Sequence, residues 1–380
     1  MENKNLELIK DIVGAENIDS QGIVYPLTVE QVVRIVKLAN QAGFPLYPMG
    51  QGLKFQSFIP KVDKGIIVSL KKLNKIIEYR PDNMSIEVEA GITTGELLEK
   101  LAPDNIFYPI DIDNLNSTLG GQIAANYYGR KKYMYKSSRF QVLGLEFVSP
   151  QGEIIRVGGR TVKNVSGYDI SQMLVGSWGA FGIITKITLR VRPRPEKNLM
   201  LKLTIDNLQE LTDIAGKILE ERMSLASLTF EHRENKFNLY LELEGFQDTV
   251  ELQGKRLKEQ YPFIDAPSLT PQQQLRAKIS VPLTNYLNLL LELEKIVADN
   301  LDFHGNITNG IVELDLPEDR IEEIKGRVDK LQGALVFDRK IIVGQGNDPN
   351  YRRILENIKK QVDPNNILFP EILLKGVEIL

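Results

Sequence analysis

The segment that decides the fold runs from residue 118 to residue 186. It contains TLGGQIAANYYG at 118–129 and RVGGRTVKNVSGYDISQMLVGSWGAFGIITK at 156–186. Between apolar stretches typical of strands, glycines gather at Gly120-Gly121, at Gly158-Gly159, at Gly167 and at Gly176, Gly179 and Gly182. Glycine-rich backbone lets amide N–H groups approach a ligand closely, and arrays of such groups bind anions, above all phosphates. The pattern therefore predicts a site for a nucleotide cofactor.

The composition of the chain excludes several kinds of chemistry. Its 380 residues favour two domains. With 47 basic and 50 acidic residues, the net charge of −3 gives no indication of nucleic-acid binding. The absence of cysteine excludes an Fe–S cluster on thiolates of this chain, and its two histidines, His232 and His304, do not provide a multi-histidine metal site.

The location of the protein is predicted from what the sequence lacks. No apolar run reaches the roughly 18 residues that suggest a transmembrane helix. The first residues, MENKNLELIKDIVG, do not contain the apolar core of a signal peptide. We therefore expect a cytoplasmic protein with no transmembrane segment.

A first glycine-containing bend is expected at Pro48–Lys54. A helix predicted to begin after Thr28 and to stop at Gly43 precedes it, followed by a short strand at 44–47. The residues after the bend, LKFQSFIP, do not open a helix, which disfavours a Rossmann-type NAD site. Either the N–H groups of Met49–Leu53 cradle a pyrophosphate, or the bend is a strand-to-strand turn that needs two glycines.

Two further bends also allow either a ligand site or a purely structural role. At Thr118–Gly121 the threonine hydroxyl and two glycines suit a ligand, but a helix N-terminus capped by threonine explains the same residues. At Gly179–Ile184 the strand backbone suits an adenine and ribose slot, but a bulged start of a strand is the simpler alternative. Trp178, just before the third bend, is expected to pack against the protein rather than to stack on a ligand.

The second half of the chain has a different pattern. RPRPE at 192–196 breaks both helix and strand and marks the best domain boundary. Beyond it, strands mix with amphipathic helices, which predicts an α+β sheet with helices on one face. The predicted elements before the boundary are a short helix at 6–14, strands at 65–79 and 85–91 about a turn, a helix at 93–103, and strands at 141–149, 153–157 and 182–192. Those after it are strands at 199–205, 225–233, 236–245, around 301–315 and at 333–337, and helices at 207–222, 247–260, 282–297, 317–330 and 349–362.

The three bends in this order resemble a known family. The chain is similar to the PCMH-type FAD-linked oxidases of the vanillyl-alcohol oxidase group, and within it to the FAD-binding subunit of bacterial glycolate oxidase. The matching motifs are YPLTVEQVVRIVKLA, PLYPMGQGLKF, STLGGQIAAN, SRFQVLGLEFVSPQGEIIRVGG and TVKNVSGYDISQMLVGSWGAFGIITKITLRVRPRP. They cover residues 20–196 densely, and FHGNITNGIVEL and DPNNILFP match more loosely beyond.

The resemblance implies a fold and a cofactor site. The fold would be α+β, with a two-part FAD-binding domain of the PCMH type at 1–196, an α+β cap domain with an antiparallel sheet at 197–345, and a C-terminal helix and tail at 346–380 that returns to the FAD domain. FAD would be bound without a covalent link, because residues 1–231 contain no histidine and the chain no cysteine. The implied cofactor-binding residues are Pro48, Met49, Gly50, Gln51, Gly52, Leu53, Lys54, Thr118, Leu119, Gly120, Gly121, Ala124, Asn126, Arg139, Gly182, Ile183 and Ile184.

Three residues depart from the family pattern. Gln51 stands where relatives usually have glycine, and Leu53 replaces a small hydroxyl residue that could bond a phosphate. Phe140 replaces an acidic residue after Arg139. These changes leave open a scaffold protein that has lost FAD.

The resemblance also implies a function. The chain would be an FAD-binding subunit of a glycolate or D-lactate (2-hydroxyacid) oxidase or dehydrogenase complex, relaying electrons with a larger catalytic flavoprotein and an Fe–S subunit. Alternatively it is a self-sufficient FAD-dependent 2-hydroxyacid dehydrogenase, for which Arg233, Arg276 and Arg339 are the candidate carboxylate ligands in the cap. No catalytic residue is assigned, and no metal is expected, since His304 alone matches the metal motif of the larger subunit.

A basic and aromatic run, RKKYMYKSSR at 130–139, has three interpretations. It forms a solvated face, helps to neutralise the FAD phosphates, or meets an acidic partner chain. Its tyrosines favour an interface slightly, because tyrosine and arginine are enriched at interfaces.

Overall fold

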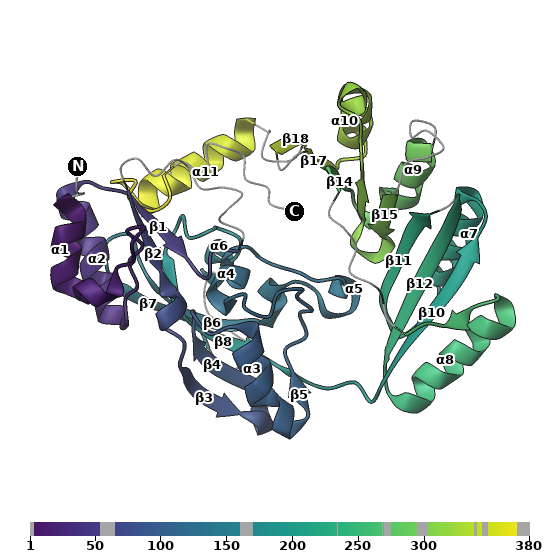
Figure 1. Ribbon diagram of the computed structural model, residues 1–380, viewed down its shortest axis with the longest axis horizontal. Coiled ribbons are helices and arrows are strands. Elements are labelled where there is room, and N and C mark those ends of the chain that lie inside the picture. The colour runs from purple at the N-terminus through teal and green to yellow at the C-terminus, as the bar shows by residue number, and fades with distance from the viewer. Residues whose placement is uncertain are drawn as a thin grey trace. The chain divides into compact units, whose positions relative to one another are not determined.

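The computed structural model describes residues 4–53, 65–159, 170–233, 235–267, 269, 275–294, 303–337, 340–343 and 349–370 (Figure 1). The chain divides into two compact units. The first unit contains residues 1–129, 137–194 and 349–377, and the second contains 130–136, 195–348 and 378–380. The α+β fold class predicted from the sequence is confirmed.

The first unit is built on short sheets flanked by helices. One sheet has the strand order β3-β4-β8-β6-β7, and strand pairs β1-β2 and β5-β9 lie apart from it. The helices are α1 Lys4–Val13, α2 Val29–Ala42, α3 Thr94–Leu101, α4 Leu119–Ala124, α6 Ser171–Leu174 and α11 Pro349–Val362. The strands are β1 Leu46–Met49, β2 Ile66–Ser69, β3 Ile76–Arg80, β4 Ser85–Glu89, β5 Ile106–Phe107, β6 Val142–Val148, β7 Ile154–Gly158, β8 Ile183–Arg190 and β9 Arg192–Pro193.

Helix α2 illustrates why these residues fold as they do. The Thr28 side chain accepts a hydrogen bond from the Gln31 amide and so caps the helix N-terminus. Gly43, with φ of 71°, ends the helix in a left-handed conformation. The apolar residues recur at helical spacing and are buried in the core of the first unit: Val29, Val32, Ile35, Val36 and Ala39.

The strand predicted at 65–79 is wrong in one respect. It is two strands in different sheets, because β2 pairs parallel with β1 whereas β3 pairs antiparallel with β4. A short 3-10 turn at Leu70–Lys72 separates them. Leu70 and Leu73 are buried there, and the Gly91 amide donates to the Leu73 carbonyl. Burial of these leucines interrupts what reads in the sequence as one continuous strand.

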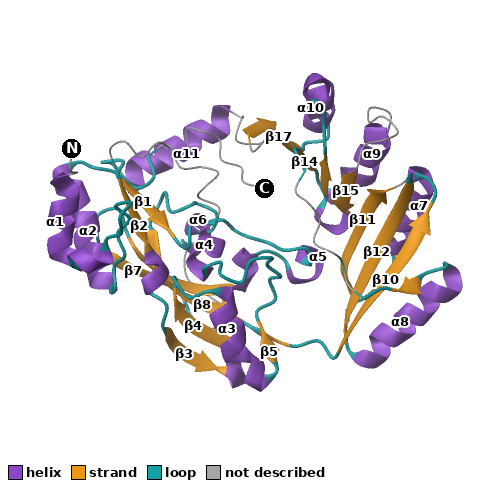
Figure 2. Cartoon of the chain, viewed as in Figure 1, coloured by secondary structure: helices purple, strands orange, loops and turns teal. Residues whose placement is uncertain are grey.

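The second unit is an antiparallel sheet with its longer helices on one face (Figure 2). The strand order is β13-β10-β12-β11-β15-β16-β14-β17-β18. Its strands are β10 Lys197–Ile205, β11 Leu225–Arg233, β12 Lys236–Gly245, β13 Ile264–Asp265, β14 Ala277–Ser280, β15 Phe303–Asn306, β16 Ile311–Leu314, β17 Ala334–Phe337 and β18 Lys340–Val343. Its helices are α5 Lys132–Tyr135, α7 Leu208–Glu220, α8 Gln247–Gln260, α9 Leu283–Glu294 and α10 Ile321–Lys330.

Alternation along the strands divides the second unit's sheet into two faces. On β12, Leu239, Leu241 and Leu243 are fully buried in the core, whereas Tyr240 and Glu242 alternate with them and point to the other face. Helices α7 and α8 pack against β10 and β12. The predicted hairpin of 225–233 and 236–245 is confirmed, with the same boundaries for both strands.

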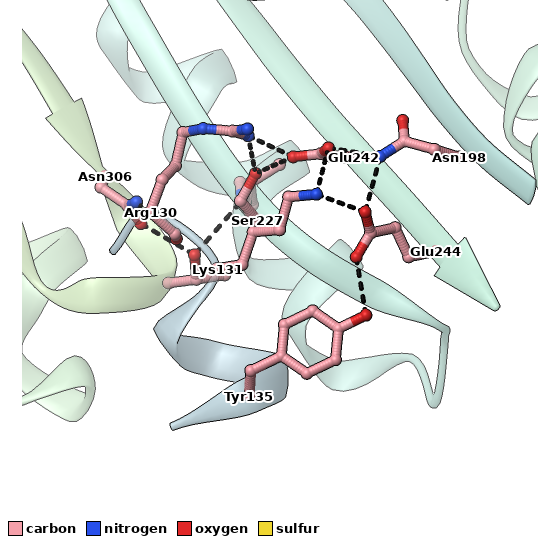
Figure 3. Close-up of polar contacts among 10 residues, drawn as sticks. Arg130, Lys131, Tyr135, Asn198, Ser227, Glu242, Glu244 and Asn306 are labelled. Carbon is pink, nitrogen blue, oxygen red and sulfur yellow. Dashed lines mark hydrogen bonds and ion pairs between the residues drawn. The ribbon is translucent and has the colours of Figure 1, made fainter. Parts of the chain in front are cut away.

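The placement of residues 130–136 differs from the domain boundaries expected from the sequence. The sequence predicts one domain over 1–196, but 130–136 belongs to the second unit, where α5 contacts β11. Arg130 and Lys131 form ion pairs with Glu242 of β12, and Lys131 also pairs with Glu244 (Figure 3). The Tyr135 hydroxyl donates to Glu244 at 2.8 Å. The paired charges explain the placement, because burying a carboxylate is costly unless cations and hydrogen-bond donors pair with it.

Neutral side chains complete this charged cluster. Asn198 of β10 donates to Glu242 at 2.6 Å and to Glu244 at 2.7 Å. Ser227 donates to Glu242 at 3.1 Å, and Asn306 donates to the Arg130 carbonyl at 3.0 Å. Of the three interpretations of the run 130–139, a solvated face does not describe Arg130 and Lys131, since both cations form ion pairs within the chain.

Candidate functional site

A single cavity in the first unit gathers all three predicted bends. It encloses about 880 Å³, counting the space that opens to solvent. Its wall includes Pro48–Leu53 from the first bend, Thr118, Gly120 and Gly121 from the second, and Gly179 and Gly182–Ile184 from the third. Segments separated by more than 120 residues in sequence therefore line one space.

Direct contacts hold the bends together. A Cβ atom at Gly50 would overlap the hydroxyl oxygen of Thr118, so the first bend reaches the second only because residue 50 is glycine. Gly179 has φ of +84°, and a Cβ there would lie 3.3 Å from Pro48, which joins the third bend to the first. The Trp178 amide, one residue before the third bend, donates at 2.9 Å to the Ala124 carbonyl at the end of helix α4, which begins at the second bend.

The first bend follows β1 and carries free amide groups. Among the described residues, the N–H groups of Gln51, Gly52 and Leu53 donate no hydrogen bond to another protein group. Gly52 has φ of +82°, which turns the backbone at this point. Three successive unpaired N–H groups in a cavity wall form the kind of concave array that binds phosphate oxygens.

The second bend is the start of helix α4. Thr118 is its N-cap and accepts a hydrogen bond from the Gly121 amide at 3.4 Å. The Gly120 amide already donates to the Ala90 carbonyl at 2.8 Å. The local structure is therefore the threonine-capped helix that was the alternative to a ligand site. The same helix also presents Gly120 and Gly121 to the cavity.

The third bend leads into strand β8 and meets the C-terminal tail. Phe369 lines the cavity and lies edge-on to Tyr47, with 5.2 Å between the ring centroids. Its amide donates to the Leu46 carbonyl at 3.0 Å. Trp178, with φ of 55°, lines the cavity and packs in the same small cluster as Tyr47 and Phe369.

The structure brings together most of the residues implied by the sequence. Those in the cavity wall are Pro48, Met49, Gly50, Gln51, Gly52, Leu53, Thr118, Gly120, Gly121, Ala124, Gly182, Ile183 and Ile184. Leu119 is fully buried in the core instead, and Asn126 and Arg139 are outside the wall. Lys54 lies outside the described residues, as do the KNVSGYD motif at 163–169 and Arg339.

Arg139 has a structural role that the sequence did not indicate. Its guanidinium donates to the Gln172 carbonyl at 3.1 Å, to the Gln172 side chain at 2.7 Å and to the Val175 carbonyl at 2.7 Å. It therefore binds the end of helix α6, where backbone carbonyls lack helical partners. Its charge is not directed at the cavity wall.

Other residues of the cavity wall were not in the implied set. They are Leu70, Ala90, Ser117, Gln122, Ala125, Tyr127, Trp178, Gly179 and Phe369. The glycine motif contained a signal for Gly179, but nothing in the sequence marks Phe369, which arrives from the far end of the chain. Burial, followed by nearby Asp113 and Asp111, raises the pKa of Tyr127, so its hydroxyl stays protonated as a hydrogen-bond donor.

The polar groups of the wall suit a dinucleotide. The free amides of the first bend would meet negative oxygens, and the apolar wall of Ile183, Ile184 and Phe369 would cover a ring system. One buried acceptor, Oε1 of Gln122, has no hydrogen-bond partner among the described residues. A ligand with both phosphate oxygens and ring or sugar donors would satisfy all of these groups.

Comparison with known proteins bears on the ligand. Residues 20–158 match the family described as FAD binding domain. This part of the chain is similar to FAD-binding domains. The matched range contains the first two bends and the strands β1–β7. FAD, a dinucleotide with a diphosphate bridge, fits the free amides and the unpaired acceptor of the cavity.

Two of the curated relatives are named as a glycolate oxidase subunit and a D-lactate dehydrogenase. The chain is 29% identical over 209 residues to glycolate oxidase subunit GlcD of Bacillus subtilis, a match that covers 55% of this chain and 44% of that protein. It is 28% identical over 235 residues to D-lactate dehydrogenase of Anaerostipes hadrus, covering 62% of this chain and 47% of that protein. The match thus spans less than half the length of these relatives. Residues 20–158 are therefore similar to an FAD-binding domain, and the chain is similar to proteins named as an oxidase subunit and a dehydrogenase.

The similarity of fold extends beyond the FAD-binding domain. A solved structure of alkyldihydroxyacetonephosphate synthase matches with a TM-score of 0.69 and 16% sequence identity, covering 91% of this chain and 75% of that one. At this identity the match supports the fold alone, and it includes the second unit.

None of the helices among the described residues is both long and apolar enough to cross a membrane. In the same residues, no group of three or more His, Cys, Asp or Glu side chains is arranged to hold a metal ion. His304 of β15 lies opposite Glu231 and Glu313 in the sheet register.

Proposed function

We propose that FAD binds without a covalent link in the cavity of the first unit, with its diphosphate at the free amides of Gln51, Gly52 and Leu53. The observation that carries this proposal is the convergence of three bends on one space, each held by a direct contact to the next. The α4 N-terminus at Gly120 and Gly121 would approach the flavin half of the cofactor. Ile183 and Ile184 of β8 would form the adenine side.

The protein's contribution is binding and shielding. When bound, FAD supplies an acceptor for two electrons. The chain's amides neutralise its phosphate oxygens, Thr118 holds the first bend against the second, and Phe369 closes the apolar wall against water. Lys54 and residues 160–169 complete the family motifs in this proposal.

The activity that we propose is that of a subunit. The chain would serve as the FAD-binding subunit of a glycolate or D-lactate oxidoreductase complex, with a larger catalytic flavoprotein and an Fe–S protein as partners, in the cytoplasm or held at the membrane by them. The names of the relatives, a glycolate oxidase subunit and D-lactate dehydrogenases, support the substrate class. In the domain arrangement that we propose, residues 346–380 return to the FAD domain.

The two candidate cap arginines that the structure describes, Arg233 and Arg276, favour a subunit over a self-sufficient dehydrogenase. Arg276 forms an ion pair with Glu318 at 3.0 Å and lies over the Phe337 ring. Arg233 is largely exposed and pairs with Glu231. Both are engaged with glutamates, so neither is held ready for a substrate carboxylate.

The test begins with the purified chain. Its visible spectrum is recorded after reconstitution with FAD, and glycolate and D-lactate are then added without oxygen. A yellow protein that keeps its colour with both substrates supports the subunit. Bleaching by either substrate would instead establish a self-sufficient dehydrogenase, and a protein that stays colourless would contradict FAD binding.

A second experiment tests the partners. The chain is co-expressed with the products of adjacent genes and isolated by a tag on its own N-terminus. Co-purification of a longer flavoprotein and a cysteine-rich protein, with glycolate oxidation that the separate chains lack, is expected. Full activity of the longer flavoprotein without this chain would contradict the relay.

A further inference from the structure

Within the part of the chain that the structure describes, one buried hydrogen-bond acceptor in the cavity wall has no partner. Gln122, on helix α4, is 2% exposed, and its Oε1 accepts no hydrogen bond from any described residue. The other half of the same amide is bound. Nε2 donates to the Thr94 hydroxyl at 2.5 Å and to the Ser117 carbonyl at 3.4 Å.

The neighbours of Gln122 determine which way its amide points. The Thr94 hydroxyl donates to the Ser117 carbonyl at 3.3 Å, so its oxygen is left as an acceptor for Gln122. If the amide were turned over, its oxygen would face the Ser117 carbonyl, and two acceptors would meet. The nitrogen therefore stays on the side of Thr94 and Ser117, and the oxygen keeps the free position.

An unpaired buried acceptor destabilises the free protein, because the group has lost its water without gaining a partner. Nearly all such groups in native proteins are bonded. Gln122 lines the cavity that the first bend also lines. We propose that Gln122 is a specificity residue for FAD, whose Oε1 accepts a hydrogen bond from an N–H or O–H group of the bound cofactor. This inference rests on the proposed function.

The amide donors of the first bend and the acceptor of Gln122 suit different parts of the cofactor. The first bend offers donors, the amides of Gln51, Gly52 and Leu53, which suit the diphosphate. The diphosphate has no donor for Gln122, so Oε1 must meet another part of the cofactor. FAD carries donors in both halves, as the ring N3–H and ribityl hydroxyls of the flavin, and as the amine and ribose hydroxyls of the adenosine.

The experiment compares binding by the full-length apoprotein and two variants. Gln122→Met keeps the length of the side chain and removes both the Oε1 acceptor and the Nε2 donor to Thr94 and Ser117. Gln41→Met, on the exposed end of α2 and outside the cavity wall, is the matched control. FAD, riboflavin and ADP are titrated separately, by flavin fluorescence or calorimetry, and the melting temperature of each apoprotein is measured.

We expect Gln122→Met to weaken FAD binding by about tenfold or more, because one buried donor of the cofactor loses its acceptor. The apoprotein should melt below the wild type, because Thr94 and Ser117 lose their hydrogen bonds from Nε2. Separately, the rise in melting temperature on adding FAD should shrink, because the cofactor loses its acceptor. Loss of riboflavin affinity alone assigns the acceptor to the flavin, and loss of ADP affinity alone assigns it to the adenosine.

Two results would overturn the inference. Equal FAD affinity of Gln122→Met and wild type would mean that a buried water meets Oε1. An equal loss in Gln41→Met would mean that the effect is not local. A wild-type protein that does not bind FAD would contradict the proposed function itself, and that result is visible before any variant is made.

Discussion

Lys359 and Asp363 form a buried ion pair, with 2.6 Å between Nζ and Oδ2 and side chains that are 8% and 1% exposed. Lys359 also donates to the Ala180 carbonyl at 2.7 Å and to the Leu368 carbonyl at 2.5 Å. Asp363 accepts from the amides of Ile367 and Leu368. One ammonium group therefore joins helix α11, the third bend and the tail that carries Phe369.

Replacing this lysine should loosen the cavity from a distance. Lys359→Met leaves Asp363 buried without its cation, and we expect the free energy of unfolding to fall by about 3 kcal/mol. FAD affinity should fall on the order of tenfold, about 1.4 kcal/mol, because Phe369 and Ala180 lose their common support. Chemical denaturation and FAD titration measure the two effects, with the exposed neighbour Lys360→Met as control. Unchanged FAD affinity would show that the tail wall is held without Lys359.

Leu53 is the departure from the family that is simplest to reverse. Its side chain lies in the cavity wall and is 42% exposed, so a smaller polar residue disturbs no core. Leu53→Ser should raise FAD affinity by about tenfold, because a hydroxyl bond to a phosphate oxygen contributes roughly 1.5 kcal/mol. Leu115→Ser, at a similarly exposed leucine outside the wall, should leave affinity unchanged. Weaker binding by Leu53→Ser would place the phosphates elsewhere.

The contact between the first two bends can be tested by a double-mutant cycle. Gly50→Ala alone should impair FAD binding strongly, since its Cβ overlaps the Thr118 hydroxyl. Thr118→Ala alone should cost about 1 kcal/mol of stability through the lost helix cap. In the double variant the overlap is gone, and we expect part of the affinity lost in Gly50→Ala to return. Strictly additive losses would mean that the two bends do not touch.

Stability in acid depends on the charged cluster of the second unit. Burial raises the pKa of Glu242, but Arg130, Lys131 and Asn198 lower it more, so its pKa falls from 4.5 to about 2. A depressed carboxyl pKa stabilises the folded state fully above the unfolded value, and the stabilisation is lost as the pH falls from about 4.5 towards 2. Glu242→Gln should cost about 3 kcal/mol at neutral pH, because Arg130 loses its ion pair with Glu242 and Lys131 loses one of its two carboxylate partners.

The measurement is a series of urea denaturations between pH 2 and pH 7. Wild type should lose stability more steeply below pH 4.5 than Glu242→Gln does. Glu251→Gln, at an exposed position on α8, serves as control and should follow the wild type. Parallel curves for wild type and Glu242→Gln would contradict the lowered pKa.

Local patterns predicted much of the fold, and they did so where the cause was local. Helix α8 was predicted at its observed bounds, 247–260, and helix α2 was predicted from its cap at Thr28 and its stop at Gly43. The glycines of the three bends were recognisable because close approach and left-handed backbone leave no other residue type. Helix caps, helix stops and left-handed glycines all depend on residues that are close together in the sequence.

The remaining features depend on contacts between distant residues. Phe369 enters the cavity wall because its backbone pairs with Leu46, more than 300 residues earlier. Arg139 has the charge expected of a phosphate ligand, but its partners on α6 use that charge. Glu242 and Glu244 alternate with leucines as solvent-facing residues of a strand would, and only the structure shows which cations cover them.

The ion pairs of residues 130–136 bear on how this protein can be divided. A recombinant fragment that begins at residue 197 would contain Glu242 and Glu244 but neither Arg130 nor Lys131, and the surface where α5 packs would be exposed to water. Such a fragment should be poorly soluble or collapse onto itself. Domain exchange with relatives must therefore carry this short stretch along with the sheet, although it lies more than 60 residues upstream in the gene.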